Sequence, residues 1–209
     1  IILEHEQTHY LKNVMRCKVN DRIIIFDGTT GEYVAEIVTI HKRFINIEIL
    51  EKTKPTCVPG DIWLIFCPLK KTRTDFLIEK STELGLRKFL PTLSDKTQTK
   101  TVSMNRCKKN IVEAVEQCGG TFIPEILPVN PLAKIIKTLP KDRILVFCDE
   151  SLESRNINDC LLKEKPEKVA LLVGPEGGFS DSERKLFRTK KNVLPVSLGN
   201  RILRAETAA

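Results

Sequence analysis

The chain has 209 residues, of which 41% are apolar, and this is enough for one large domain or for a small and a medium one. No apolar run approaches the roughly 18 residues of a transmembrane helix, which excludes a membrane span. A formal net charge of +7 favours a polyanionic partner, although charge reports on association and not on fold.

Residues 1–50 have the pattern of short β-strands. Strands are predicted at Arg22–Asp27, Glu32–Ile40 and Phe44–Leu50, the last with isoleucines at alternate positions, as is typical of a half-buried strand. His5–Arg16 is predicted as one short helix ahead of them. Several short strands with little helix indicate a small β-barrel.

A polar segment with two prolines and a glycine, Glu51–Gly60, is the predicted linker, after which strands and helices alternate. The predicted strands are Ile62–Cys67, Phe89–Leu93, Ile144–Cys148, Val169–Val173 and Val193–Ser197. The predicted helices are Thr74–Leu84, Ser103–Cys118, Pro131–Leu139 and Asp181–Arg188, the last with capping-box spacing between Ser180 and Glu183. We therefore expect a β module at residues 1–55 and an α/β domain at residues 60–209.

The seven cysteines form no C-x-x-C pair and are odd in number, which fits neither a zinc site nor a disulfide scaffold. Cys67 and Cys148 lie in apolar runs and are expected to be small core residues, in a reducing, cytoplasmic compartment. His5 and His9 share a helix face without a third ligand nearby in sequence. We interpret them as surface histidines and expect no metal.

Two segments at the ends of predicted strands are the candidate ligand-binding loops. Gly174–Gly178 follows Val169–Val173, and Leu198–Thr207 follows Val193–Ser197. Open α/β sheets bind ligands at that edge, and glycines let a backbone approach a ligand where a Cβ would collide. The first segment lacks a Walker lysine, and Glu176 would repel a phosphate, so a neutral or cationic ligand face is favoured. An ordinary turn that needs glycine for its dihedral angles is the alternative.

The second segment sets Arg201, Arg204 and Glu206 beside a glycine turn. The planar fork of an arginine matches phosphate or carboxylate, and Glu206 is expected to hold Arg204 or to accept a proton. The alternative is a surface ion pair at the start of a helix.

Cations also follow the first strand of the α/β domain, at Lys70, Lys71 and Arg73. They fall at the same edge of the predicted sheet and would attract a phosphate backbone, unless they only solvate the start of a helix. Lys12 and Arg16 are weaker candidates of the same kind in the β module.

Five ordered blocks resemble the RsmE-type 16S ribosomal RNA (uracil-1498, N3)-methyltransferases, a branch of the SPOUT class. The blocks are His9–Arg16 with Asp27-Gly28, then Lys80–Gly85, Glu113–Gly119, Gly174–Ser180 and Leu198–Ala208. Two positions depart from the family pattern, because Gly120 and Lys96 stand where arginine is usual. The chain does not begin with methionine and stops in what reads as a first helical turn, so we expect both natural ends to be missing.

The resemblance implies a PUA-like β-barrel followed by an α/β domain with a trefoil knot, in a homodimer. It also implies S-adenosyl-L-methionine as cofactor and 16S rRNA, in the 30S subunit, as substrate. The expected cofactor contacts are Leu172, Gly174, Pro175, Glu176, Gly177, Leu198, Gly199, Ile202 and Leu203. Arg204 and Glu206 are the expected catalytic residues. The expected RNA contacts are Arg201, Lys70, Lys71, Arg73, Lys12 and Arg16.

Three other functions stay open at this point. A SPOUT enzyme could instead methylate the ribose 2′-OH of transfer or ribosomal RNA. Gly120 and Lys96 also admit an RNA-binding protein with impaired catalysis. A nucleotide-phosphate binder is the most distant alternative, because the glycine segment lacks a lysine.

Overall fold

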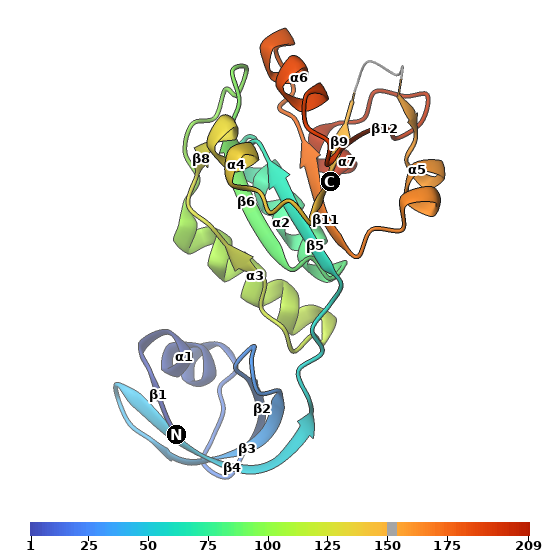
Figure 1. Cartoon of the computed structure of the whole chain (residues 1–209). Helices are drawn as coiled ribbons and strands as arrows, with labels where there is room; N and C mark the ends of the chain where they lie inside the picture. Colours follow the sequence, from blue (N-terminus) through green and yellow to red (C-terminus); the bar gives the residue numbers. More distant parts are fainter. Residues whose placement is uncertain (150–153) are drawn as a thin grey trace. The chain divides into compact units, whose positions relative to one another are not determined.

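The computed structural model describes residues 1–149 and 154–209, which form two compact units (Figure 1). The first unit consists of Ile1–Val58 and Gly120–Ile123, and the second of Pro59–Gly119 and Pro124–Ala209. Within the described ranges, no helix combines the length and the apolar character that crossing a bilayer requires.

The first unit is an antiparallel sheet of four strands in the order β1-β4-β3-β2, with a helical segment after β1. Its elements are β1 (Ile2–Glu4), α1 (His5–His9), the π-helix η1 (Tyr10–Val14), β2 (Arg22–Phe26), β3 (Glu32–Ile40) and β4 (Phe44–Lys54). The β3–β4 pair shifts register at several places, and such bulges increase the local twist of a strand pair. The sheet therefore curls into a half-barrel (Figure 1), as the short strands predicted.

The core of this unit lies on one face of the curled sheet. Ala35, Ile37, Ile45 and Ile47 are all buried, which confirms the alternation at Ile45 and Ile47, whereas Ile49, the third isoleucine of that pattern, is exposed. β4 continues to Lys54, beyond the strand expected to end at Leu50, so the predicted linker begins as a strand. This extension is held by Glu32, whose carboxylate accepts hydrogen bonds from Thr53 and Lys54.

Residues Gly120–Ile123 belong to the first unit although they follow a helix of the second. The hydroxyl of Thr121 accepts a hydrogen bond from the Cys57 amide (2.9 Å) and donates one to the Pro55 carbonyl (3.2 Å). A Cβ at Gly28, where φ is +79°, would lie 2.9 Å from the side chain of Ile123. This return of the chain was not predicted, because so short a segment has no periodicity to recognise.

The second unit is built on a parallel sheet with the strand order β10-β12-β9-β11-β5-β6-β7, and β8 also pairs with β6. The strands are β5 (Asp61–Phe66), β6 (Lys88–Leu93), β7 (Glu125–Ile126), β8 (Asn130–Pro131), β9 (Ile144–Cys148), β10 (Arg155–Asn156), β11 (Lys168–Val173) and β12 (Val193–Ser197). The helices are α2 (Lys71–Glu83), α3 (Met104–Cys118), α4 (Leu132–Thr138), α5 (Ile157–Glu164), α6 (Asp181–Arg188) and α7 (Ala205–Ala208). The longer elements predicted for this domain are confirmed with small shifts at their ends, whereas α5, β7, β8 and β10 were not predicted.

Buried aromatic rings hold α6 and the loop before it against the sheet. The ring centroids of Phe147, Phe179 and Phe187 lie 4.8–5.3 Å from one another, and all three side chains are buried. The predicted capping box of α6 is present, with Ser180 and Glu183 each bound to the other's backbone amide. Cys67 is buried as expected, and burial raises the pKa of its thiol, so it behaves as a neutral core group.

A buried arginine lies at the opposite end of the central strands. Arg143 donates to the carbonyls of Asp61 and Val169 (both 2.9 Å) and forms an ion pair with the Asp61 carboxylate (2.8 Å). Its guanidinium carbon lies 3.6 Å from the centroid of the Trp63 ring. Burial opposes ionisation of Asp61, but Arg143 outweighs it and holds the pKa of that carboxyl below its usual value. This arginine therefore ties β5 to β11 and to the start of β9.

Replacing Arg143 with methionine should lower the free energy of unfolding by about 3 kcal/mol or more, because a carboxylate and two carbonyls lose their donor. Urea denaturation measures the change. The control Lys168→Met breaks an exposed pair with Asp142 and should cost less than about 1 kcal/mol. Equal losses in the two variants would contradict a special contribution of Arg143.

Candidate functional site

The sheet of the second unit changes direction of winding between β5 and β11. These strands are neighbours, but the chain leaves β5 through α2 toward β6 and leaves β11 through α6 toward β12, on the other side. At such a switch point the loops at the carboxyl ends of the two strands diverge, and ligands bind in the crevice between them. The loop that follows β11 is the glycine segment singled out from the sequence, and the loop that follows β5 carries the predicted cations Lys70, Lys71 and Arg73.

The glycine loop, residues 174–180, folds back over the core after β11. The amide of Gly178 donates to the carbonyl of Pro175 (2.9 Å), which closes a turn with Glu176 and Gly177 exposed at its tip. A Cβ at Gly174 would lie 2.7 Å from the ring of Phe179, so only glycine lets this ring fill the core beneath the loop. Gly174 therefore has a packing role, and the exposed face of the loop is backbone.

The second predicted loop, residues 198–204, follows β12. Gly199 has a φ of +112°, a Cβ there would meet no atom within 4 Å, and its amide donates to the hydroxyl of Ser197 (3.3 Å). Ile202 is 79% exposed, an unusual position for a large apolar side chain. The loop thus offers open backbone and an uncovered apolar side chain next to the exposed Arg201 and Arg204.

Arg73, in the first turn of α2, connects the glycine loop with α7. Its guanidinium lies 3.4 Å from the carboxylate of Glu176 and 3.4 Å from that of Glu206. The sequence had led us to expect a phosphate contact for Arg73, and a pairing of Glu206 with Arg204. The structure instead brings Arg73 and Glu206 together, from segments far apart in the chain.

The carboxylate of Glu206 is unusual in its surroundings. Its side chain is 11% exposed, and the Oε2 atom is buried and has no hydrogen-bond partner in the described part of the chain. Buried polar atoms are nearly always paired, so an unpaired one marks a position where a ligand donor would be favourable.

A third loop, which follows β6, also reaches this edge. Asp95 accepts a hydrogen bond from the Ser180 hydroxyl (2.5 Å), and its amide donates to Glu183 (2.9 Å). A Cβ at Gly177 would lie 3.3 Å from the Cβ of Lys96. Lys96 stands where arginine is usual in the family, but the sequence does not predict its contact with Gly177, because a short polar loop has no periodic pattern that indicates its partner.

Three further cations that the sequence singled out lie at the ends of these loops. Lys70 and Lys71 are exposed at the start of α2, and Arg204 caps the start of α7. None of these three has an ion-pair partner among residues 1–149 and 154–209. The edge of the sheet therefore combines glycine backbone, one apolar side chain and unpaired positive charge.

Comparison with known proteins places this arrangement in a family. A model described as an RNA methyltransferase domain matches residues 56–209, and one described as an RNA methyltransferase PUA domain matches residues 3–50. Ribosomal RNA small subunit methyltransferase E of Rickettsia conorii is 32% identical over 202 residues, which cover 96% of this chain and 82% of that protein. The protein of the same name from Buchnera aphidicola of Schizaphis graminum is 36% identical and covers 100% and 86% of the two chains.

Solved structures agree with these relatives. The crystal structure of ribosomal RNA small subunit methyltransferase E from Neisseria gonorrhoeae, bound to S-adenosyl methionine, matches with a TM-score of 0.89 and 26% identity, over 100% of this chain and 87% of that one. A methyltransferase from Legionella pneumophila with bound SAM matches with the same TM-score and coverage at 29% identity. The resemblance carried by the sequence blocks is thereby confirmed: the chain belongs to the ribosomal RNA small subunit methyltransferase E family, with a PUA domain ahead of an RNA methyltransferase domain.

Proposed function

We propose that this protein transfers a methyl group from S-adenosyl-L-methionine to N3 of a uridine in 16S rRNA. The observation that carries the proposal is the pair of loops, 174–180 and 198–204, which follow parallel strands β11 and β12 at one edge of the sheet. Family membership and the cofactor bound in the Neisseria and Legionella relatives support the same cofactor here. We further propose that the protein acts in the cytoplasm, as a homodimer, on rRNA within the 30S subunit.

The residues present fit an adenosine-type cofactor. The open space at Gly199 and the exposed Ile202 suit a flat, partly apolar group, and Leu203 adds a half-buried wall. Leu172 is fully buried, so its contribution would be the backbone at the end of β11. The proposed cofactor contacts are thus backbone groups of Leu172, Gly174, Pro175, Glu176, Gly177, Leu198 and Gly199, with the side chains of Ile202 and Leu203.

Bound S-adenosylmethionine supplies a methyl group on a positively charged sulfur. A cation is compatible with Glu176, whose charge is already partly balanced by Arg73 at 3.4 Å. This charge would disfavour a phosphate in the same place, which argues against a nucleotide-phosphate binder.

The uracil must be unpaired or flipped out of its helix, because N3 faces the partner base in a pair. N3 also carries a proton and becomes a good nucleophile only when that proton leaves. The exposed guanidinium of Arg204 would stabilise the negative charge that develops on O2 or O4 of the base. Glu206 is paired with Arg73 through one oxygen, and its second, buried oxygen has no hydrogen-bond partner in the described ranges and would accept an N–H of a ligand that reached it.

The reaction is tested with 16S rRNA and with 30S subunits as acceptors of labelled methyl. Mass analysis of digested RNA should show N3-methyluridine, and more product with the assembled subunit. Ribose 2′-O-methylation would contradict the proposed chemistry. Failure of S-adenosylmethionine to bind in calorimetry would instead favour an RNA-binding protein with impaired catalysis.

Replacing Arg204 with alanine should lower kcat by about 100-fold or more, because the developing charge on the base loses its donor. Cofactor affinity, measured by calorimetry, should stay within about threefold, since the proposed cofactor contacts lie elsewhere. The matched control Arg188→Ala removes an exposed arginine of α6 and should leave kcat unchanged. Full activity of the Arg204 variant would remove this residue from the mechanism.

The variant Arg73→Met tests whether Arg73 stabilises the glycine loop and α7 through its ion pairs or instead binds an RNA phosphate. If the ion pairs of Arg73 hold the glycine loop and α7 in place, the variant should bind S-adenosylmethionine about three- to tenfold more weakly. Lys70→Met removes a neighbouring unpaired cation, and it should weaken RNA binding while leaving cofactor affinity unchanged. If Arg73→Met instead weakens RNA binding and leaves cofactor affinity unchanged, Arg73 is a phosphate contact, as the sequence predicts.

A further inference from the structure

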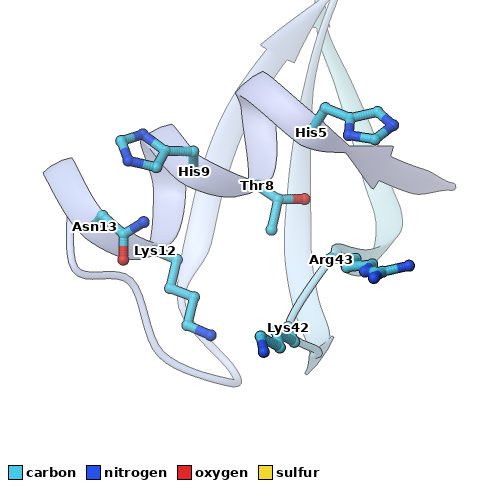
Figure 2. Close-up of a pocket in the computed structure, with 7 residues that line it drawn as sticks. All are labelled: His5, Thr8, His9, Lys12, Asn13, Lys42 and Arg43. Carbon is cyan, nitrogen blue, oxygen red and sulfur yellow. The ribbon is translucent and has the colours of Figure 1, made fainter.

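The first unit contains a cavity of about 370 Å³ between its helical segment and the hairpin that joins β3 to β4 (Figure 2). The lining residues are His5, Thr8, His9, Lys12, Asn13, Lys42 and Arg43. Figure 2 shows Lys12 extending from the helical segment toward the hairpin that carries Lys42 and Arg43. Only Lys12 among these residues had been considered as an RNA contact from the sequence.

The charged side chains that line this basic pocket are all cationic. Three cations and two imidazoles line it, and none of the lining residues is an aspartate or a glutamate. Lys12, Lys42 and Arg43 have no ion-pair partner within the described ranges, whereas Lys54 of the same unit is paired with Glu32. A cleft lined by a single sign of charge concentrates ions of the opposite sign, so the pocket favours an anion.

Both walls of the pocket are held by backbone and core contacts. The hairpin is closed by a hydrogen bond from the His41 amide to the Phe44 carbonyl (2.9 Å), and the two rings stack at 4.3 Å. Lys42 and Arg43 are the central residues of that turn and are exposed. On the other wall, the buried Thr8 donates its hydroxyl to the Leu3 carbonyl (2.8 Å) and fastens the helix to β1.

The helical wall contributes further polar groups. Figure 2 shows His9, Lys12 and Asn13 along one part of the helical segment and His5 at its other end, where the backbone φ of His5 is +43°. Imidazole and amide N–H groups are donors, and a phosphate offers only acceptor oxygens to them. The fork of Arg43 can bind two of those oxygens at once, while Lys12 and Lys42 act as point charges.

We propose that this pocket binds a phosphate group of the RNA backbone, so that the first unit contributes to holding the substrate of the second. The inference rests on the proposed function for its ligand, rRNA. Because phosphate contacts carry no sequence information, the pocket contributes to affinity and not to the choice of base. The pocket residues should therefore affect the KM for RNA and leave kcat unchanged.

The test uses 16S rRNA as probe and compares two variants with equal loss of charge. Lys12→Ala/Arg43→Ala removes one cation from each wall, and Arg22→Ala/Lys52→Ala removes two exposed cations of the same unit outside the pocket. The pocket variant should bind RNA roughly tenfold more weakly, and its slope of log affinity against log salt should fall by about one to two. The control variant should keep wild-type affinity and slope.

Binding of RNA, binding of S-adenosylmethionine and methyl transfer at saturating RNA are measured separately. The pocket variant should keep wild-type cofactor affinity and kcat, and its thermal unfolding should match that of the control. An equal loss of RNA affinity in both variants would contradict a phosphate site in the pocket, since the loss of net charge alone would then explain the weaker binding. If the wild-type protein binds RNA through the pocket but transfers no methyl group, the proposed methyl transfer is wrong while the phosphate site in the pocket is supported.

Discussion

The strands of the second unit run parallel, and this shared direction determines where the loops of the candidate site lie. Since β5, β6, β11 and β12 all belong to one parallel sheet, the loops that leave them emerge at the same edge. The winding changes between β5 and β11, and ligands of open α/β sheets bind at such a point. Glycines 177 and 199, Arg73 and Asp95 are brought to one edge by topology, although they are scattered along the chain.

Contacts between the loops give this edge its rigidity. Asp95 binds Ser180 and Glu183, so the loop after β6 is fastened to the start of α6. Arg73 fastens the start of α2 to the glycine loop and to α7. Each exposed ion pair contributes little alone, but together with Phe179 beneath the loop they restrain three segments at once. A site made largely of backbone needs such restraint, because backbone groups select a ligand only when their positions are fixed.

Local patterns in the sequence predicted most of the fold, but not the pairings between side chains at the edge of the sheet. The apolar runs of β9 and β12 and the capping box of α6 are properties of short segments, so they could be recognised. The helix α5 was missed because only Cys160 of its residues is buried and a lysine, not a glycine, ends it in the left-handed conformation. The pairing of Arg73 with Glu206 depends on tertiary structure alone, and no spacing in the sequence encodes it.

The net charge of +7 does not say which cations are engaged within the fold, but the ion pairs of the structure do. Arg143 and Arg106 are bound to carboxylates within the fold, and Arg73 lies within ion-pair distance of Glu176 and Glu206. In the described ranges, Lys12, Lys42, Arg43 and Arg204 lack such partners. A cation that is already paired has less to gain from a phosphate than one that is not, because binding must first weaken the existing contact. The unpaired cations are therefore the part of the net positive charge that is free to attract an anionic partner, whereas the paired arginines are engaged within the fold.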